Sequence, residues 1–148
     1  MTTDKLQGEF REVLASKVDV HILRDCLAAK LAGAARNEYG RNELAGKALG
    51  VCAITLSRWT VAGRMLPIDE QLQSTIGRIA QALFDVERLN PPAEAAPKGI
   101  ADRIFEAFDA GMVHAAVENT QGNKVAAARL LGVHRNWISK YTKARREA

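Results

Sequence analysis

The sequence predicts an all-α protein that contains two related helix-turn-helix units, and three observations support this prediction. The 148 residues are 47% hydrophobic but only 5% aromatic, and Ala and Leu supply most of the apolar residues, which favours packed helices over β-sheet. Apolar residues recur every three or four positions along several segments. A glycine-centred pattern also occurs twice, once around Gly50 and once around Gly132.

Two amphipathic helices are expected before the first of these patterns. Residues 4–17 predict a helix with Asp4 as its N-cap, and its apolar stripe is Leu6, Phe10, Val13 and Leu14. Residues 19–38 predict a second helix, in which Leu23, Leu27 and Leu31 repeat every four positions and face the core.

Residues 41–64 form the first glycine-centred pattern and predict a helix-turn-helix over about 42–62. Gly50 tolerates the positive φ of a tight turn, and Gly46 is the small residue where the two helices approach most closely. The outward face of its second helix is weakly polar: Cys52, Ala53, Ile54, Ser57 and Arg58. Two interpretations stay open, namely protein contact or weak DNA contact through phosphates by the cations Arg41, Lys47, Arg58 and Arg64.

A connector helix ending near Leu89 and a proline-rich linker are expected next. The apolar residues of the helix are spaced four and three apart, as in a heptad seam: Leu72, Ile76, Ile79, Leu83 and Val86. Dimerisation and packing within one chain both explain this seam. Three prolines in residues 90–99 predict an extended linker and a domain boundary.

Residues 122–146 predict a second helix-turn-helix after a helix over 100–120, in which Gly111 is expected to mark a kink or a break. Gly132 occupies the turn and Ala128 the close approach of the two helices. Ile138 is expected to point inward, whereas Arg135 and Asn136 point outward with Ser139 and Lys140. Donors and cations on one face suit a helix that enters the DNA major groove, although a helical hairpin with a solvated basic face is the simpler alternative.

The stretch NTQGNKVAAARLLGVHRN resembles the DNA-binding end of the Fis/NtrC family of bacterial regulators. The resemblance covers about 35 to 45 residues and implies a helical DNA-binding unit that dimerises through the helices before the motif. On that basis Phe105, Phe108 and Met112 are candidates for a dimer interface, with core packing as the alternative. The chain departs from the family at Trp137, where a small Thr is usual, and at His134, and these departures affect which DNA sequence is bound.

The two units are similar enough to indicate an internal duplication. Residues 34–59 and 116–141 share eight identities in 26, where random pairing gives roughly two. Positive charge is concentrated in residues 113–148, which carry seven Lys and Arg against two Glu, whereas the rest of the chain carries fourteen against fifteen Asp and Glu. A homodimer on a near-palindromic site and a pseudo-dimer within one chain are both compatible with this arrangement.

We therefore predict a sequence-specific DNA-binding transcriptional regulator, with double-stranded DNA as its partner, a homodimeric state and a cytoplasmic, nucleoid-associated location. The alternative is a protein-interaction module, such as an antiactivator or assembly factor, that binds another transcription protein. Three parts are expected: residues 1–66, 67–99 and 100–148. The predicted DNA-binding residues are His134, Arg135, Asn136, Ser139, Lys140, Lys143, Lys124, Arg145, Arg146, Arg58, Arg41 and Arg64.

Catalysis, metal binding and membrane insertion are not expected. The sequence has no phosphate loop, nucleophile elbow or zinc-spaced Cys/His set, so no cofactor is predicted. It has no signal peptide and no apolar run as long as a membrane-spanning helix. Cys26 and Cys52 lie in apolar segments and are predicted to be buried free thiols.

Overall fold

The chain folds into eight α-helices in the part that the structure describes, residues 2–89 and 99–147 of a computed structural model, with side chains as far as Thr142. No strand occurs within these ranges, so the all-α prediction is confirmed. The helices are α1 (Thr3–Ala15), α2 (Val20–Tyr39), α3 (Asn42–Leu49), α4 (Ala53–Arg64), α5 (Glu70–Leu89), α6 (Ile100–Asn119), α7 (Lys124–Leu131) and α8 (Arg135–Glu147).

Polar side chains define the starts of several helices. Thr2 caps α1 by accepting a hydrogen bond from the Lys5 backbone N–H at 3.2 Å, so the prediction that Asp4 caps this helix is wrong by two positions. Asp19 caps α2 through the His21 N–H at 2.8 Å, and Asp69 accepts the Leu72 N–H at the start of α5 at 2.8 Å.

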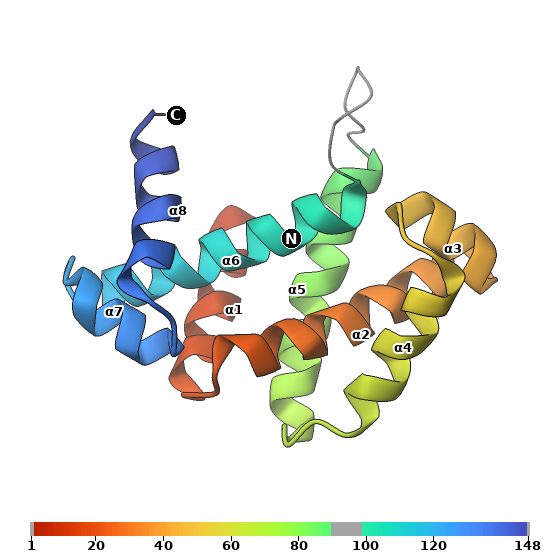
Figure 1. Ribbon diagram of the computed structural model, residues 1–148, viewed down its shortest axis with the longest axis horizontal. Helices are drawn as coiled ribbons and strands as arrows, with labels where there is room; N and C mark the ends of the chain where they lie inside the picture. Colours follow the sequence, from red (N-terminus) through yellow and green to blue (C-terminus); the bar gives the residue numbers. More distant parts are fainter. Residues whose placement is uncertain (1, 90–98, 148) are drawn as a thin grey trace.

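The long helices α2 and α6 organise the molecule. Figure 1 shows α1, α2, α5 and α6 in the centre, α3 and α4 at one end, and α7 and α8 at the other. Helix α2 packs on α3, α4 and α5, whereas α6 packs on α7, α8 and α1. The buried side chains form one hydrophobic core that extends from α1 to α8. The division into three parts stays a prediction.

Helix α6 is continuous through Gly111, so the expected break between two shorter helices does not occur. A Cβ atom at position 111 would collide with the ring of Phe10 in α1. The glycine therefore lets α1 and α6 approach closely, and the Phe10 ring also lies 5.8 Å from that of Phe108.

The residues proposed for dimerisation lie mostly in the core of the single chain. On α5, Ile76 and Ile79 have no exposed surface, and Leu72 and Leu83 are buried at 8% exposure. On α6, Phe108 and Met112 are also fully buried, and the half-buried Phe105 packs against Trp59 with ring centroids 5.6 Å apart. In the single chain these side chains pack against its own helices, the alternative that the sequence left open, and a role in dimerisation stays a prediction.

The linker stays a prediction, and the prediction for the two cysteines is met only in part. Residues 90–98 of the expected linker lie outside the described residues. Cys26 is buried as predicted, but Cys52 is exposed, because it lies in the extended step between the turn and α4. Within the described ranges, no helix is long and apolar enough to span a membrane, and no cluster of His, Cys, Asp and Glu is placed to hold a metal ion.

Candidate nucleic-acid interface

A backbone reversal before α7 positions the second helix-turn-helix. Gln121 and Gly122 adopt φ values of 56° and 87°, and the Gly122 N–H bonds to the Val117 carbonyl at 2.8 Å. Asn123 then caps α7, since its Oδ1 accepts the Ala126 N–H at 3.1 Å, as predicted from the sequence.

The turn between α7 and α8 has the geometry that the glycine predicts. Gly132 has φ 74° and ψ 34°, in the left-handed region. The N–H groups of Gly132 and Val133 bond to the carbonyls of Arg129 and Ala128 at 3.2 and 3.0 Å. The Asp19 carboxylate at the start of α2 lies against Gly132, so a side chain at this position would meet it. Both the positive φ and this close approach favour glycine.

Helix α8 begins with a histidine cap that sequence reasoning missed. The Asn136 backbone N–H donates to His134 Nδ1 at 3.1 Å, which requires this nitrogen to be unprotonated. His134 was predicted as a secondary DNA contact, and its side chain is exposed. A histidine directly before the first residue of a predicted helix is the signal that would have identified the cap. Its Nδ1 can accept a backbone hydrogen bond, as the side-chain oxygen of an N-cap Asn or Asp does.

The inner side of α8 is anchored on α6. Ile138 is fully buried, as predicted, and Trp137 and Tyr141 are half-buried with ring centroids 5.0 Å apart. The Tyr141 hydroxyl donates a hydrogen bond to Asp109 Oδ2 at 3.2 Å. Because Asp109 belongs to α6, this bond ties the orientation of α8 to the helix before the motif.

Asp109 links three helices through one buried carboxylate. Its Oδ1 lies 3.2 Å from Arg24 Nε of α2, whereas its Oδ2 accepts the Tyr141 hydrogen bond. Burial raises the pKa of Asp109, and the Arg24 guanidinium opposes this effect. Burial, and then the Asp109 charge, raises the pKa of Tyr141 to about 12, so the hydroxyl stays a donor at neutral pH.

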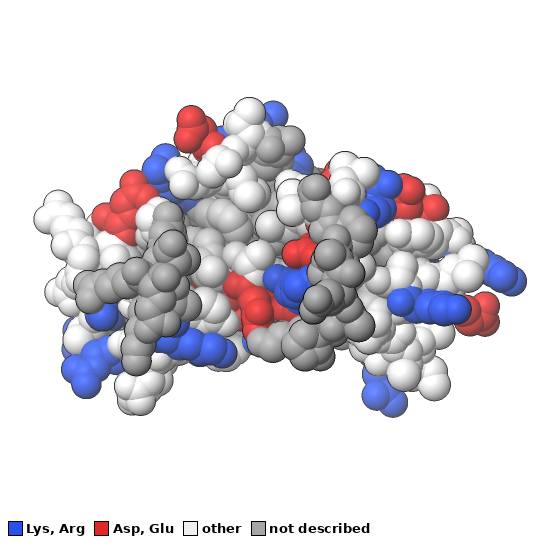
Figure 2. All heavy atoms as spheres, turned by 90° about the horizontal axis from the view of Figure 1, so that it is seen from above, with Lys and Arg blue, Asp and Glu red and all other residues white. Residues whose placement is uncertain are grey.

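The outer side of α8 is exposed where DNA contacts were predicted. His134, Arg135, Asn136 and Lys140 are exposed, and Ser139 is half-buried, as is Lys124 at the start of α7. The side chains of Lys143, Arg145 and Arg146 lie outside the described part of the chain. Figure 2 shows Lys and Arg at both ends of the elongated molecule, where the two helix pairs lie. The geometry therefore brings the predicted base-contacting residues together at one surface.

The α3–α4 pair has a turn with the same backbone geometry. Gly50 has φ 80° and ψ 29°, and the N–H groups of Gly50 and Val51 bond to the carbonyls of Lys47 and Gly46 at 3.3 and 2.8 Å. The predicted phosphate contacts are exposed at this end of the molecule: Arg41, Lys47, Arg58 and Arg64. For this surface, DNA contact and protein contact both stay predictions.

A polar network that the sequence did not reveal locks α4 to α2 and α3. Arg36 donates to Thr60 Oγ1 at 2.8 Å and to Asn42 Oδ1 at 3.3 Å. Asn42 Nδ2 in turn donates to Ser57 Oγ at 3.2 Å. Ser57, assigned from the sequence to the outward face, therefore also serves the internal packing of α4.

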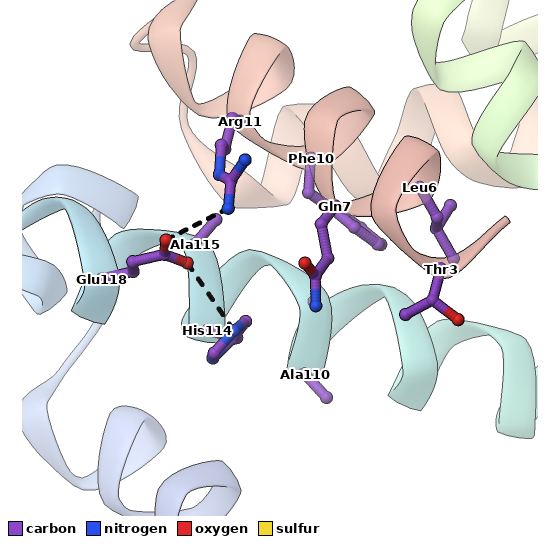
Figure 3. Close-up of a pocket in the computed structure, with 10 residues that line it drawn as sticks. Thr3, Leu6, Gln7, Phe10, Arg11, Ala110, His114, Ala115 and Glu118 are labelled. Carbon is purple, nitrogen blue, oxygen red and sulfur yellow. Dashed lines mark hydrogen bonds and ion pairs between the residues drawn. The ribbon is translucent and has the colours of Figure 1, made fainter.

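A groove of about 160 Å³ lies between α1 and α6, away from the turns. Figure 3 shows Arg11 and His114 both directed at Glu118, which they approach to 3.1 and 3.7 Å. The lining is otherwise mainly apolar, including Leu6 and Phe10. The Arg11–Glu118 ion pair joins α1 to α6, whereas His114 and Glu118 both belong to α6, and none of the three belongs to α8.

Comparison with known families supports the interpretation of the C-terminal unit. Residues 104–138 match the family described as "Bacterial regulatory protein, Fis family", a range that runs from within α6 to Ile138 in α8. The α3–α4 pair lies outside this match. Comparisons with curated proteins and with solved structures found no match for the chain. The C-terminal part thus has the helix-turn-helix form in the structure and is similar, over residues 104–138, to a family of bacterial regulatory proteins.

Proposed function

We propose that this protein, whose C-terminal part is a Fis-family helix-turn-helix, is a transcriptional regulator that binds DNA sequence-specifically by placing α8 in the major groove. The observation that carries the proposal is the exposure of Arg135, Asn136 and Lys140 on a helix whose opposite side is fixed by the buried Ile138. A recognition helix needs this combination of a rigid inner side and a polar, cationic outer side.

Arg135 and Asn136 are the proposed base contacts. They occupy the first turn of α8, and the N-terminal residues of a recognition helix are those that contact base edges. A guanidinium fits the O6 and N7 acceptors of guanine, and a carboxamide fits N6 and N7 of adenine. His134 is a secondary contact, since its Nδ1 atom already accepts a backbone hydrogen bond. Ser139 is a secondary contact because it is half-buried.

The remaining cations are proposed to contact phosphates, which position the protein without reading sequence. Lys140 is exposed one turn after Asn136, and Lys124 lies at the start of α7. Phosphate contacts by Lys143, Arg145 and Arg146 are proposed from their positions in the sequence. At the other end of the molecule, the exposed Arg41, Arg58 and Arg64 are assigned the same role.

Paired substitutions on α8 test the proposal. Fluorescence anisotropy would measure affinity for a duplex selected from a random library and for unselected DNA. Arg135→Ala is expected to lose about 1 to 3 kcal/mol on the selected duplex alone, because it loses a base contact. Lys140→Ala is expected to weaken both duplexes alike and to reduce the salt slope by about one.

Lys5→Ala is the matched control, because Lys5 is an exposed cation of α1 outside both helix pairs. Equal losses on both duplexes for Arg135→Ala would contradict its base contact. A wild-type protein that does not bind DNA at low salt would contradict the proposed function and favour the protein-interaction alternative. The exposed apolar side chains of α4 would then mark its surface, since Ile54 is 66% exposed and Val61 58%.

A further inference from the structure

We propose that a single chain binds DNA as a pseudo-dimer, with both helix pairs on one asymmetric site and α4 in the place that a second copy of α8 would take. This inference rests on the proposed function and extends it to stoichiometry and to the form of the DNA site. Of the two arrangements that the sequence left open, the inference favours the pseudo-dimer within one chain over the homodimer.

From Gly40 to the start of α4, and again from Gly122 to the start of α8, the chain has the same backbone plan at one constant offset in sequence, the offset that relates Gly50 to Gly132. Helices α1 and α5 are not related by this offset. The glycines with positive φ in the described ranges are Gly40 and Gly50 in one half and Gly122 and Gly132 in the other, with φ of 86°, 80°, 87° and 74°. Helices α3 and α7 begin and end at this same offset, and α4 and α8 begin at it. Sequence similarity alone does not require the left-handed positions to coincide.

The contacts between the halves are reciprocal. Helix α1 of the first half packs on α6 of the second, and α5 of the second half packs on α2 of the first. The Gly132 turn lies against Asp19, directly before α2, and a Cβ atom placed on Gly50 would lie 3.3 Å from Cα of Gly99, directly before α6. Figure 1 shows α2 and α6 through the middle of the molecule, with α3 and α4 at one end and α7 and α8 at the opposite end.

Each half thus contributes its first helix to the other half. One chain thereby forms the hydrophobic core that two copies of a helix-turn-helix unit would form together. The first helix of each half covers the long helix of the other half, and the α5 side chains Ile76 and Ile79 are fully buried in that position. A second chain would have to displace these helices to pair in the same way. Leu72, Ile76, Ile79 and Leu83 of the α5 seam are therefore covered without a partner, whereas Val86 near the end of α5 is 56% exposed.

The two outward faces are related but carry different chemistry. Arg58 of α4 corresponds to Lys140 of α8, so a cation suited to phosphate is present in both halves. The base-contacting Arg135 and Asn136 correspond to Ala53 and Ile54, which cannot form bidentate hydrogen bonds with a base. Ile54 is 66% exposed and suits a thymine methyl group. One half-site is thus read by hydrogen bonds and the other by phosphate and methyl contacts, so the DNA site is not a palindrome.

The test combines stoichiometry with footprinting on the duplex selected by the full-length protein. Sedimentation equilibrium is expected to give the mass of one chain for the free protein and one chain per duplex for the complex. Hydroxyl-radical footprinting is expected to show two protected segments about one DNA turn, roughly 34 Å, apart. Arg58→Ala is expected to remove protection from one segment and to lower affinity about fivefold, whereas Arg135→Ala affects the other segment.

A second duplex carries two inverted copies of the half-site that Arg135 contacts. It is expected to bind no more tightly than the selected duplex, because Ala53 and Ile54 gain nothing from the added bases. Two chains per duplex, or tighter binding of the palindrome, would overturn the pseudo-dimer and leave the proposed function intact. No DNA binding at low salt would overturn both. Lys5→Ala is again the control, and circular dichroism would be used to check that each variant is folded.

Discussion

The turns at Gly50 and Gly132 have the same backbone geometry, yet the helices that follow them present different surfaces. Both glycines adopt the left-handed backbone conformation. In each turn the glycine N–H bonds to the carbonyl three residues before it, and the next N–H bonds to the carbonyl five residues before it. Helix α8 begins with Arg135 and Asn136, whereas α4 begins with Ala53 and Ile54. A few small and apolar residues thus specify the scaffold, and the outward residues vary without disturbing it.

The inner sides of the two helix pairs differ as well. Trp59 of α4 packs edge-on against the Phe105 ring, an apolar contact with α6. Its counterpart Tyr141 makes a hydrogen bond to Asp109, and the residue that corresponds to Asp109 in the first half is Leu27. At this pair of positions the second half has a hydrogen bond and the first an aromatic contact, and the directional contact of α4 comes instead from the Arg36–Thr60 hydrogen bond. Exchanging residues between corresponding positions tests these differences directly.

The largest effect is expected at Gly111, which corresponds to Ala29 in the first half. Gly111→Ala is expected to lower the free energy of unfolding by about 2 kcal/mol, because the added methyl group collides with the Phe10 ring and outweighs the gain in helix propensity. Urea unfolding followed by circular dichroism measures the loss. In a double-mutant cycle, Phe10→Leu should relieve part of it, and strictly additive losses would show that the ring is not the cause.

A smaller effect is expected at Gly46, which corresponds to Ala128. Gly46→Ala is expected to destabilise the protein by about 1.5 kcal/mol, because its Cβ atom would lie 2.6 Å from the Val51 carbonyl oxygen. The reverse exchange, Ala128→Gly, should cost about 1 kcal/mol through helix propensity, with a further loss from its buried methyl group. Thermal and urea unfolding measure both variants. A neutral Gly46→Ala would mean that the first turn is no tighter than the second.

Tyr141→Phe tests the polar anchor of α8 and is expected to cost about 1 kcal/mol, the typical contribution of one hydrogen bond. Since the pKa of Tyr141 is raised to about 12 from 10.0, the folded protein retains this proton where the unfolded chain loses it. The hydroxyl's contribution is therefore complete below pH 10 and is lost as pH rises through 12. The stability difference between wild type and variant should shrink over that window, and a constant difference would contradict the anchor.

The smallest effect is expected at Gly33, which corresponds to Ala115. Nothing lies within 4 Å of a Cβ atom at this position in α2. Gly33→Ala is expected to stabilise the protein by about 0.5 kcal/mol through helix propensity and a less flexible unfolded chain. A shift of the urea midpoint to higher concentration, with an unchanged slope, is the expected result. Destabilisation would indicate that the halves differ in packing around α2 as well.

Local sequence was enough to predict the helices and the orientation of α8. Apolar spacing fixes which side of a helix is buried, so Ile138 inward and Arg135 outward follow from position alone. Gly132 predicted the turn because few other residues adopt a positive φ without strain. The Asn123 cap was predictable for a similar reason, since its bond reaches only three residues along the chain.

Tertiary structure decided what each buried face packs against. Periodicity shows that Ile76 and Ile79 are covered, but a helix of the same chain and a helix of a second chain satisfy them equally, so the seam alone does not identify the partner. The Tyr141–Asp109 bond spans 32 residues and the Arg36–Thr60 bond 24, and no local pattern encodes such pairs. The sequence determined the helices and their polar faces through local forces, whereas the packing of α1 on α6 and of α5 on α2 depends on contacts between residues far apart in the chain.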